Sequence, residues 1–154
     1  MLVDRLSYFI ATSFYTGYFP IAPGTVGSGL ALIIFYVFPE LRGLYLFLLT
    51  GLVFFIGVWA ATEVEKTDGH DASIINIDEV VGMWVSLLFL PAGISGIWWW
   101  VGAFFVFRAF DVVKPFPVGW SQKLPGGWGV MVDDVLAGIY TNLLLRLLYV
   151  IFVR

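Results

Sequence analysis

Hydrophobic residues dominate this chain to an extent that a soluble fold of the same length cannot accommodate. Of its 154 residues, 60% are hydrophobic and only 12% are charged. A soluble domain of this size buries only about 70% of the surface that its unfolded chain exposes, and about a quarter of its residues are charged. The composition therefore predicts an integral membrane protein and argues against a soluble domain.

Five apolar stretches are candidates for helices in or across a bilayer. They cover approximately residues 25–38, 43–62, 73–90, 96–113 and 129–152. At 1.5 Å per residue, the third and fourth stretches would each extend about 27 Å, close to the hydrocarbon thickness of about 30 Å. We predict an all-α, polytopic helical membrane bundle with about five membrane helices, which forms a single domain over residues 1–154.

The segment between the third and fourth stretches decides the topology. Its sequence, Leu90-Pro91-Ala92-Gly93-Ile94-Ser95-Gly96, is uncharged and rich in residues that interrupt helices. A hairpin at this segment places residues 63–79 and 108–134 on one side of the membrane, whereas a continuous crossing would separate them. We predict the hairpin, which gathers every acidic residue except Glu40 on one face.

Basic residues and aromatic residues indicate the orientation of this bundle. The predicted acidic face carries Arg5, Lys66, Arg108, Lys114 and Lys123, whereas the other face carries Arg42 and Arg154. Because cytoplasmic loops are enriched in lysine and arginine, we expect the acidic face and the N-terminus to be cytoplasmic. The run Trp98-Trp99-Trp100 is then expected to form an aromatic belt at the opposite interface.

Five carboxylates lie at the predicted cytoplasmic ends of three helices, and they are the main candidates for chemistry. They are Asp78, Glu79, Asp111, Asp133 and Asp134. A charged side chain at the bilayer centre costs about 2.5–3.5 kcal/mol, and less near the interface, so five together imply a compensating cation or a water-filled cavity. Hard oxygen ligands of this kind suit Mg²⁺. Taken singly, each acid could instead be structural, because acids at helix starts also complement the helix dipole.

Two basic residues alternate with these acids at the end of the fourth stretch. Arg108 and Asp111 are three residues apart and therefore share a helical face, either as a structural ion pair or as part of a site. Lys114 precedes Pro115, so the helix should end near Val113 and present the lysine at a corner. Both cations are candidates for binding a phosphate group.

Two further segments offer weaker signals for chemistry. Residues 22–29 combine glycines with the hydroxyls of Thr25 and Ser28 at a predicted helix start, where backbone N–H groups could receive a phosphate oxygen. Glycines in membrane helices also serve simply to let helices approach closely. His70 lies in a loop with Asp68 and Asp71, where it is either solvated or available for acid–base chemistry.

Four blocks of this sequence, in order, resemble the phosphatidylglycerophosphatase A family, and together they extend over nearly the whole chain. They are residues 22–28 (APGTVGS), 77–84 (IDEVVGMW), 108–117 (RAFDVVKPFP) and 129–138 (GVMVDDVLAG). The chain departs from the family at Asp71-Ala72, where the family often has Asp-Pro, which leaves the role of Asp71 open.

The resemblance implies a Mg²⁺-dependent lipid phosphatase in the bacterial inner membrane, with its active site on the cytoplasmic face. The implied reaction converts phosphatidylglycerophosphate to phosphatidylglycerol and inorganic phosphate. The five carboxylates would hold one or two metal ions and carry the catalysis, with Thr25, Ser28, Arg108 and Lys114 on the phosphate. Direct attack by water is preferred to a phosphoaspartyl intermediate, because no Asp-x-Asp-x-Thr motif is present.

Other classes of function are less consistent with the sequence. A divalent-cation or proton-coupled transporter is the main alternative, but its acids should lie near the bilayer midplane and on pathways to both faces. A non-catalytic assembly subunit would need no metal. The lysines and arginines are scattered singly and the formal net charge is −3, which argues against nucleic-acid binding. With no cysteine, the chain has neither a disulfide nor a thiolate site. The sequence indicates no oligomeric state.

Overall fold

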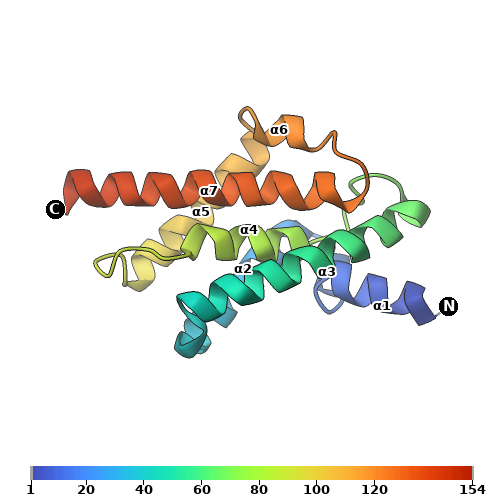
Figure 1. Ribbon diagram of the computed structural model, residues 1–154, viewed down its shortest axis with the longest axis horizontal. Helices are drawn as coiled ribbons and strands as arrows, with labels where there is room; N and C mark the ends of the chain where they lie inside the picture. The colour runs from blue at the N-terminus through green and yellow to red at the C-terminus, as the bar shows by residue number, and fades with distance from the viewer. Residues whose placement is uncertain (1, 154) are drawn as a thin grey trace.

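The computed structural model describes the backbone of residues 2–153 and the side chains of residues 4–153, and over this range every regular element is helical (Figure 1). Two short 3₁₀ helices, η1 and η2, accompany seven α-helices. The elements are α1 (Leu2–Ala11), η1 (Thr16–Tyr18), α2 (Pro23–Val37), η2 (Pro39–Leu41), α3 (Leu44–Asp68), α4 (Ile77–Leu87), α5 (Ile97–Val113), α6 (Val118–Ser121) and α7 (Gly127–Phe152). The all-α prediction is confirmed.

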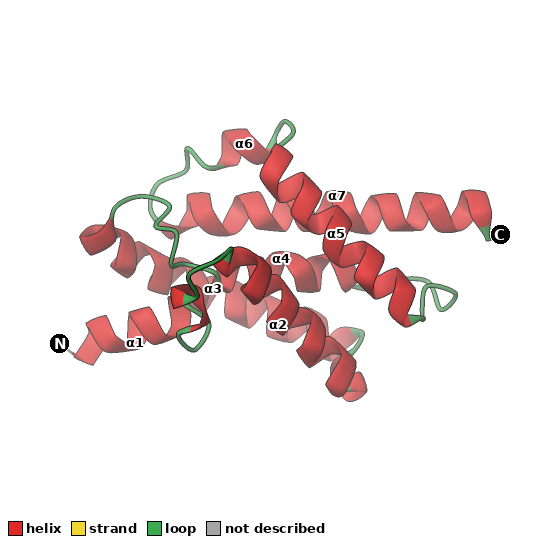
Figure 2. Cartoon of the chain, turned by 180° about the vertical axis from the view of Figure 1, so that it is seen from behind, coloured by secondary structure: helices red, strands yellow, loops and turns green. Residues whose placement is uncertain are grey.

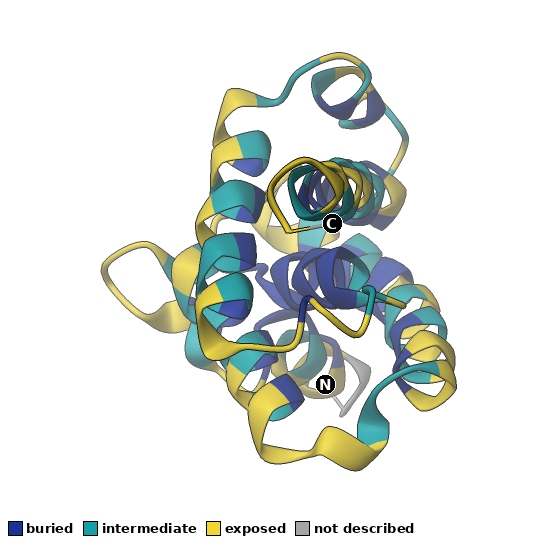
Figure 3. Cartoon of the chain, turned by 90° about the vertical axis from the view of Figure 1, so that its left-hand side faces the viewer, coloured by how far each residue is buried: buried dark blue, intermediate teal, exposed yellow. Residues whose placement is uncertain are grey.

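Helix α4 lies at the centre of the bundle and is almost entirely buried (Figure 3). Ten of its 11 residues are buried, and it contacts α2, α3, α5 and α7. Its packing against α7 is close because Gly82 has no side chain: a Cβ there would come within 2.7 Å of the carbonyl oxygen of Asp134 and of the Phe107 ring. This close approach places the second turn of α4, one turn after Asp78 and Glu79, against α5 and α7.

The length predicted for this central helix is wrong. The stretch 73–90 is helical only over Ile77–Leu87, which is about 16.5 Å long and too short to cross a bilayer alone. Its last carbonyls are instead satisfied by α7, whose Asn142 Nδ2 donates to the carbonyl oxygens of Val85, Ser86 and Leu88 at 3.3, 3.0 and 2.8 Å. Arg146 Nη2 donates a hydrogen bond to the carbonyl oxygen of Phe89, the residue that follows Leu88. Hence α7 supplies partners for several of the carbonyls at the end of α4 inside the bundle.

The predicted hairpin between the third and fourth apolar stretches is present. Residues 88–96 connect α4 to α5, and α5 returns along the bundle (Figure 2). Arg108 of α5 thereby forms an ion pair with Glu79 in the first turn of α4. At the same end, His70 contacts the backbone of Gln122. Residues 63–79 and 108–134 therefore lie at one end of the molecule, as the hairpin requires, whereas their shared side of the membrane stays a prediction.

The other predicted stretches agree with the structure within a few residues, except at the end of α3. Helix α2 begins with Pro23, whose fixed φ and missing N–H suit the first helical position. Helix α5 ends at Val113, as expected from the Lys114-Pro115 pair. Helix α3 continues to Asp68, six residues beyond the predicted end at residue 62, and its last turns are polar. This extension brings Glu65 and Asp68 to the acidic end.

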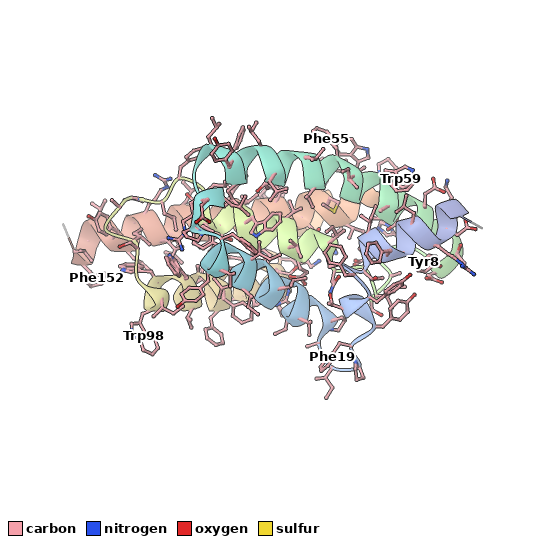
Figure 4. The ribbon with its side chains drawn as sticks, turned by 90° about the horizontal axis from the view of Figure 1, so that it is seen from below. Tyr8, Phe19, Phe55, Trp59, Trp98 and Phe152 are labelled. Atoms are coloured by element: carbon pink, nitrogen blue, oxygen red, sulfur yellow. The ribbon has the colours of Figure 1, made fainter. Side chains whose placement is uncertain are left out.

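Helices α3 and α7 are long and apolar enough to cross a membrane, and they expose much of their apolar surface. Their most apolar stretches have mean hydropathies of 2.2 and 1.8, and only 33% and 22% of those stretches are buried. Phe55 and Trp59 point outward from α3, and Phe152 lies on the outside of α7 (Figure 4). Apolar faces exposed over this length are typical of contact with lipid, which favours association of the chain with a membrane.

Candidate active site

The five predicted carboxylates converge at one end of the bundle. Asp78 and Glu79 lie in the first turn of α4, Asp111 in the last turn of α5, and Asp133 and Asp134 in the second turn of α7. Each is no more than 9% exposed. They line a cavity of about 370 Å³, whose full lining is Ala22, Pro23, Gly24, Asp71, Ala72, Ser73, Ile75, Asp78, Glu79, Arg108, Asp111, Val112, Lys114, Asp133 and Asp134. We call this the acidic cavity.

Arg108 links two of the helices that form the acidic cavity. Its Nη1 forms an ion pair with Glu79 of α4 and lies 2.9 Å from Asp111 Oδ2, one turn further along α5. The guanidinium thus neutralises part of the charge of two buried carboxylates. The predicted Arg108–Asp111 pair is present, and it belongs to the cavity rather than to an isolated helical surface.

Lys114 occupies the corner at which α5 ends. Its backbone is left-handed (φ 47°), and its Nζ lies 2.6 Å from Asp133 Oδ2 and 3.9 Å from Asp111 Oδ1. Burial by itself would lower the pKa of Lys114, but the hydrogen bond and charge of Asp133 outweigh it and raise that pKa. Lys114 therefore enters the cavity as a cation.

Three of the five carboxylates are arranged so that they could hold a metal ion together. Oxygen atoms of Glu79, Asp111 and Asp134 all lie within 4.8 Å of one another. Asp78 Oδ1 and Asp134 Oδ2 are buried without a hydrogen-bond partner. Asp133 is engaged differently, since its two oxygens accept from Lys114 and from the backbone N–H of Asp134. A cation bound in the cavity would give a partner to the unpaired oxygens of Asp78 and Asp134.

The glycine-rich segment that begins α2 forms one wall of the acidic cavity through its backbone. Gly24 lies so close to Glu79 and Arg108 that a Cβ at this position would collide with the Glu79 carboxyl group. Ser28 is fully buried, and its Oγ lies 3.0 Å from Glu79 Oε2 and 2.9 Å from the carbonyl oxygen of Gly24. Thr25 is exposed and is not part of the cavity lining. Ser28 is not in the lining either, and it reaches the cavity only through its contact with Glu79.

His70 lies outside the acidic cavity lining, whereas its neighbour Asp71 belongs to it. His70 Nε2 is 3.0 Å from the carbonyl oxygen of Gln122, and its Nδ1 is 2.7 Å from Glu65 Oε1. The hydrogen bond to Gln122 raises the pKa of His70; burial partly offsets this, and the charge of Glu65 adds to it. Gln122 Nε2 also donates to Asp71 Oδ2 at 3.1 Å. The contacts of His70 and Asp71 with Gln122 thus hold the loop after α3 against the segment that follows α6.

Asn76 is a positioning residue that sequence reasoning missed. It is fully buried just before α4, and its Nδ2 donates to Thr16 Oγ1 at 3.0 Å and to the carbonyl oxygen of Pro23 at 3.3 Å. Its backbone N–H donates to the carbonyl oxygen of Ala11. Asparagine is common at helix starts, which was the available signal, but here the side chain ties the α1–α2 connection to the start of α4.

Comparison with known proteins matches most of the chain, including the residues of the acidic cavity, to one family. The family model described as phosphatidylglycerophosphatase A matches residues 9–149. A protein of Bacteroides thetaiotaomicron named putative phosphatidylinositol-3-phosphatase is 41% identical over 145 residues, which is 91% of each chain. Proteins named phosphatidylglycerophosphatase A from Escherichia coli and Haemophilus influenzae are 38% and 39% identical, covering 86% of this chain and 77% and 82% of their own. No solved structure matches this chain.

Proposed function

The chain belongs to the phosphatidylglycerophosphatase A family, and from that premise we propose that it hydrolyses the terminal phosphomonoester of phosphatidylglycerophosphate. The products are phosphatidylglycerol and inorganic phosphate, in a step of phospholipid synthesis. The observation that carries the proposal is the acidic cavity itself, in which buried carboxylates and two cations meet at one end of an apolar bundle. A transporter is less well supported, because its carboxylates would extend toward both ends.

Magnesium is the cofactor that we propose for this site. Six carboxylates line the acidic cavity against two cations, Arg108 and Lys114, so a phosphate dianion would be repelled without further positive charge. Glu79, Asp111 and Asp134 would hold the ion, with Asp78 and Asp133 as the remaining predicted ligands. When bound, Mg²⁺ supplies charge that stabilises the phosphoryl oxygens and favours ionisation of water.

The protein's own residues account for binding and orientation of the phosphate. Arg108 and Lys114 neutralise its charge, the first with a planar fork and the second with a point charge that Asp133 holds in place. Water attacks phosphorus and gives its proton to a cavity carboxylate. The bond from phosphorus to the glycerol oxygen breaks, and that oxygen takes up a proton. Ser28 supports the site through its contact with Glu79. Direct phosphate binding by Thr25 and Ser28 and proton transfer by His70 stay predictions.

We further propose that the whole chain is one multi-pass domain of the bacterial inner membrane, with the acidic cavity and the N-terminus on the cytoplasmic side. The surrounding helices α2, α3, α5 and α7 cross the bilayer wholly or in part, and α4 completes the set of five from within. The lysines and arginines of residues 4–153 support this orientation, since most belong to the end that carries the cavity.

Single cysteines test this topology directly, because the natural chain has none. Thr67→Cys and Lys123→Cys lie at the cavity end, and Ser95→Cys lies in the α4–α5 connection at the other end. A membrane-impermeant maleimide should label Ser95→Cys in cells with a permeable outer membrane, and the other two variants only after the inner membrane is opened. Labelling of Thr67→Cys and Lys123→Cys from opposite sides would refute the model.

Release of inorganic phosphate by the purified protein in one detergent tests the substrate. We expect kcat/KM for phosphatidylglycerophosphate to exceed that for glycerol 3-phosphate by at least about tenfold, because the acyl chains orient the lipid at the cavity. Phosphatidylinositol 3-phosphate is the third substrate, in view of the name of the Bacteroides relative. Equal values for the lipid and the soluble ester would leave a phosphatase without the proposed lipid specificity.

A further inference from the structure

A second cavity lies beside the acidic cavity at the same end of the molecule. It has a volume of about 520 Å³ and is lined by Tyr8, Tyr18, Asp68, Ala72, Ser73 and Ile74. Ala72 and Ser73 belong to both linings. The two cavities therefore adjoin at Ala72 and Ser73. Tyr8 lies at the end of the molecule opposite Trp98 and Phe152 (Figure 4).

The polar groups of the second cavity are already organised by one hydrogen bond between distant segments. Tyr8 of α1 donates its hydroxyl to Asp68 Oδ2 at 2.8 Å. This bond raises the pKa of Tyr8, which therefore keeps its proton. Asp68 is the last residue of α3, where a negative charge opposes the helix dipole. A carboxylate in this position is unfavourable for the helix itself, and the partner that the structure gives it is the hydroxyl of Tyr8.

The chemistry of this lining favours a neutral, hydroxylated ligand. The residues that line it offer one carboxylate, two phenols and one serine hydroxyl, and they include no lysine or arginine. A phosphate group would meet the Asp68 charge without compensation, whereas an alcohol can donate to the carboxylate and accept from a phenol or from Ser73. The acidic cavity, by contrast, contains both cations.

We propose that Tyr8, Asp68 and Ser73 form a subsite that binds the free hydroxyl of the substrate's polyol head group. The proposal rests on the proposed function, which places the terminal phosphate in the acidic cavity. In phosphatidylglycerophosphate this hydroxyl is on the carbon next to the one that bears the terminal phosphate, so the two groups require adjoining sites. The subsite selects lipids whose phosphate sits on a hydroxylated carbon chain, and it takes no part in bond breaking.

Paired substrates test this subsite. The first is phosphatidylglycerophosphate, and the second is its analogue with 1,3-propanediol in place of the head-group glycerol, which lacks only that hydroxyl. We expect the natural protein to favour the first by about tenfold in kcat/KM, chiefly through KM. In Tyr8→Phe and in Asp68→Asn, the ratio should fall to within about twofold of one. Tyr45→Phe, which changes an exposed tyrosine near the start of α3, is the matched control and should keep the ratio of the natural protein.

Each outcome of this experiment has a defined meaning. A loss of activity in Tyr8→Phe that is equal for both substrates, with the ratio intact, would show a merely structural role and overturn the subsite. A ratio of one in the natural protein would overturn it as well, while phosphate release would leave the proposed function standing. If the natural protein releases phosphate from neither lipid, the proposed function itself fails.

Discussion

Replacing Asp78, Asp111 or Asp134 by asparagine is expected to lower kcat/KM for phosphatidylglycerophosphate by about two orders of magnitude or more. Asparagine preserves the shape of the side chain but removes its charge. A hundredfold loss corresponds to about 2.7 kcal/mol of transition-state stabilisation, which is typical of removing one electrostatic contact in an active site. Steady-state phosphate release in detergent gives the value. Near-normal rates in all three variants would exclude the acidic cavity as the active site.

Two measurements separate this effect from a folding defect. Glu40→Gln changes an exposed carboxylate in η2, away from the acidic cavity, and should retain the natural rate. Without metal, Asp134→Asn should be at least as resistant to thermal unfolding as the natural protein, because it removes one of several buried negative charges that repel one another. An inactive variant that is also much less stable would indicate a structural role for that carboxylate.

Removal of divalent metal should abolish phosphate release, and added Mg²⁺ should restore it. The reason is electrostatic, since the substrate phosphate must enter a cavity whose carboxylates outnumber its cations by six to two. Because the ion binds the folded state, Mg²⁺ should also raise the temperature of thermal unfolding in a concentration-dependent manner. That second readout is independent of activity, and Asp134→Asn should reduce it. Full activity after exhaustive chelation would contradict the metal proposal.

The sequence allowed the gathering of the carboxylates to be predicted, because it depends on few choices. Once the breaker-rich segment around Pro91 was read as a hairpin, helix direction alone brought Glu79 and Asp111 to one end. The helix end at Val113 followed from Lys114-Pro115 by steric reasoning. These conclusions rest on local chemistry and on chain direction, which a single sequence contains.

Features that depend on tertiary packing could not be predicted in this way. Nothing in the apolar stretch 73–90 shows that its helix stops at Leu87. The carbonyl groups near this end accept hydrogen bonds from Asn142, which is more than 50 residues away in the sequence. Similarly, Trp98 is largely exposed, as expected of a belt residue, but Trp100 is buried against Phe35 with the Arg42 guanidinium over its ring. The roles of Asn76 and Tyr8 also come from contacts between distant segments.

The cap that α7 places on α4 has a consequence for how the protein is made. Helix α4 is synthesised well before Asn142 and Arg146, so on the proposed topology its last carbonyls would lack these partners while α7 is still in the ribosome. It is also too short to be retained as an independent span. On the proposed topology, the nascent chain would complete its membrane insertion only when α7 arrives. Since α7 also carries Asp133 and Asp134, its arrival would complete the proposed active site as well as the fold.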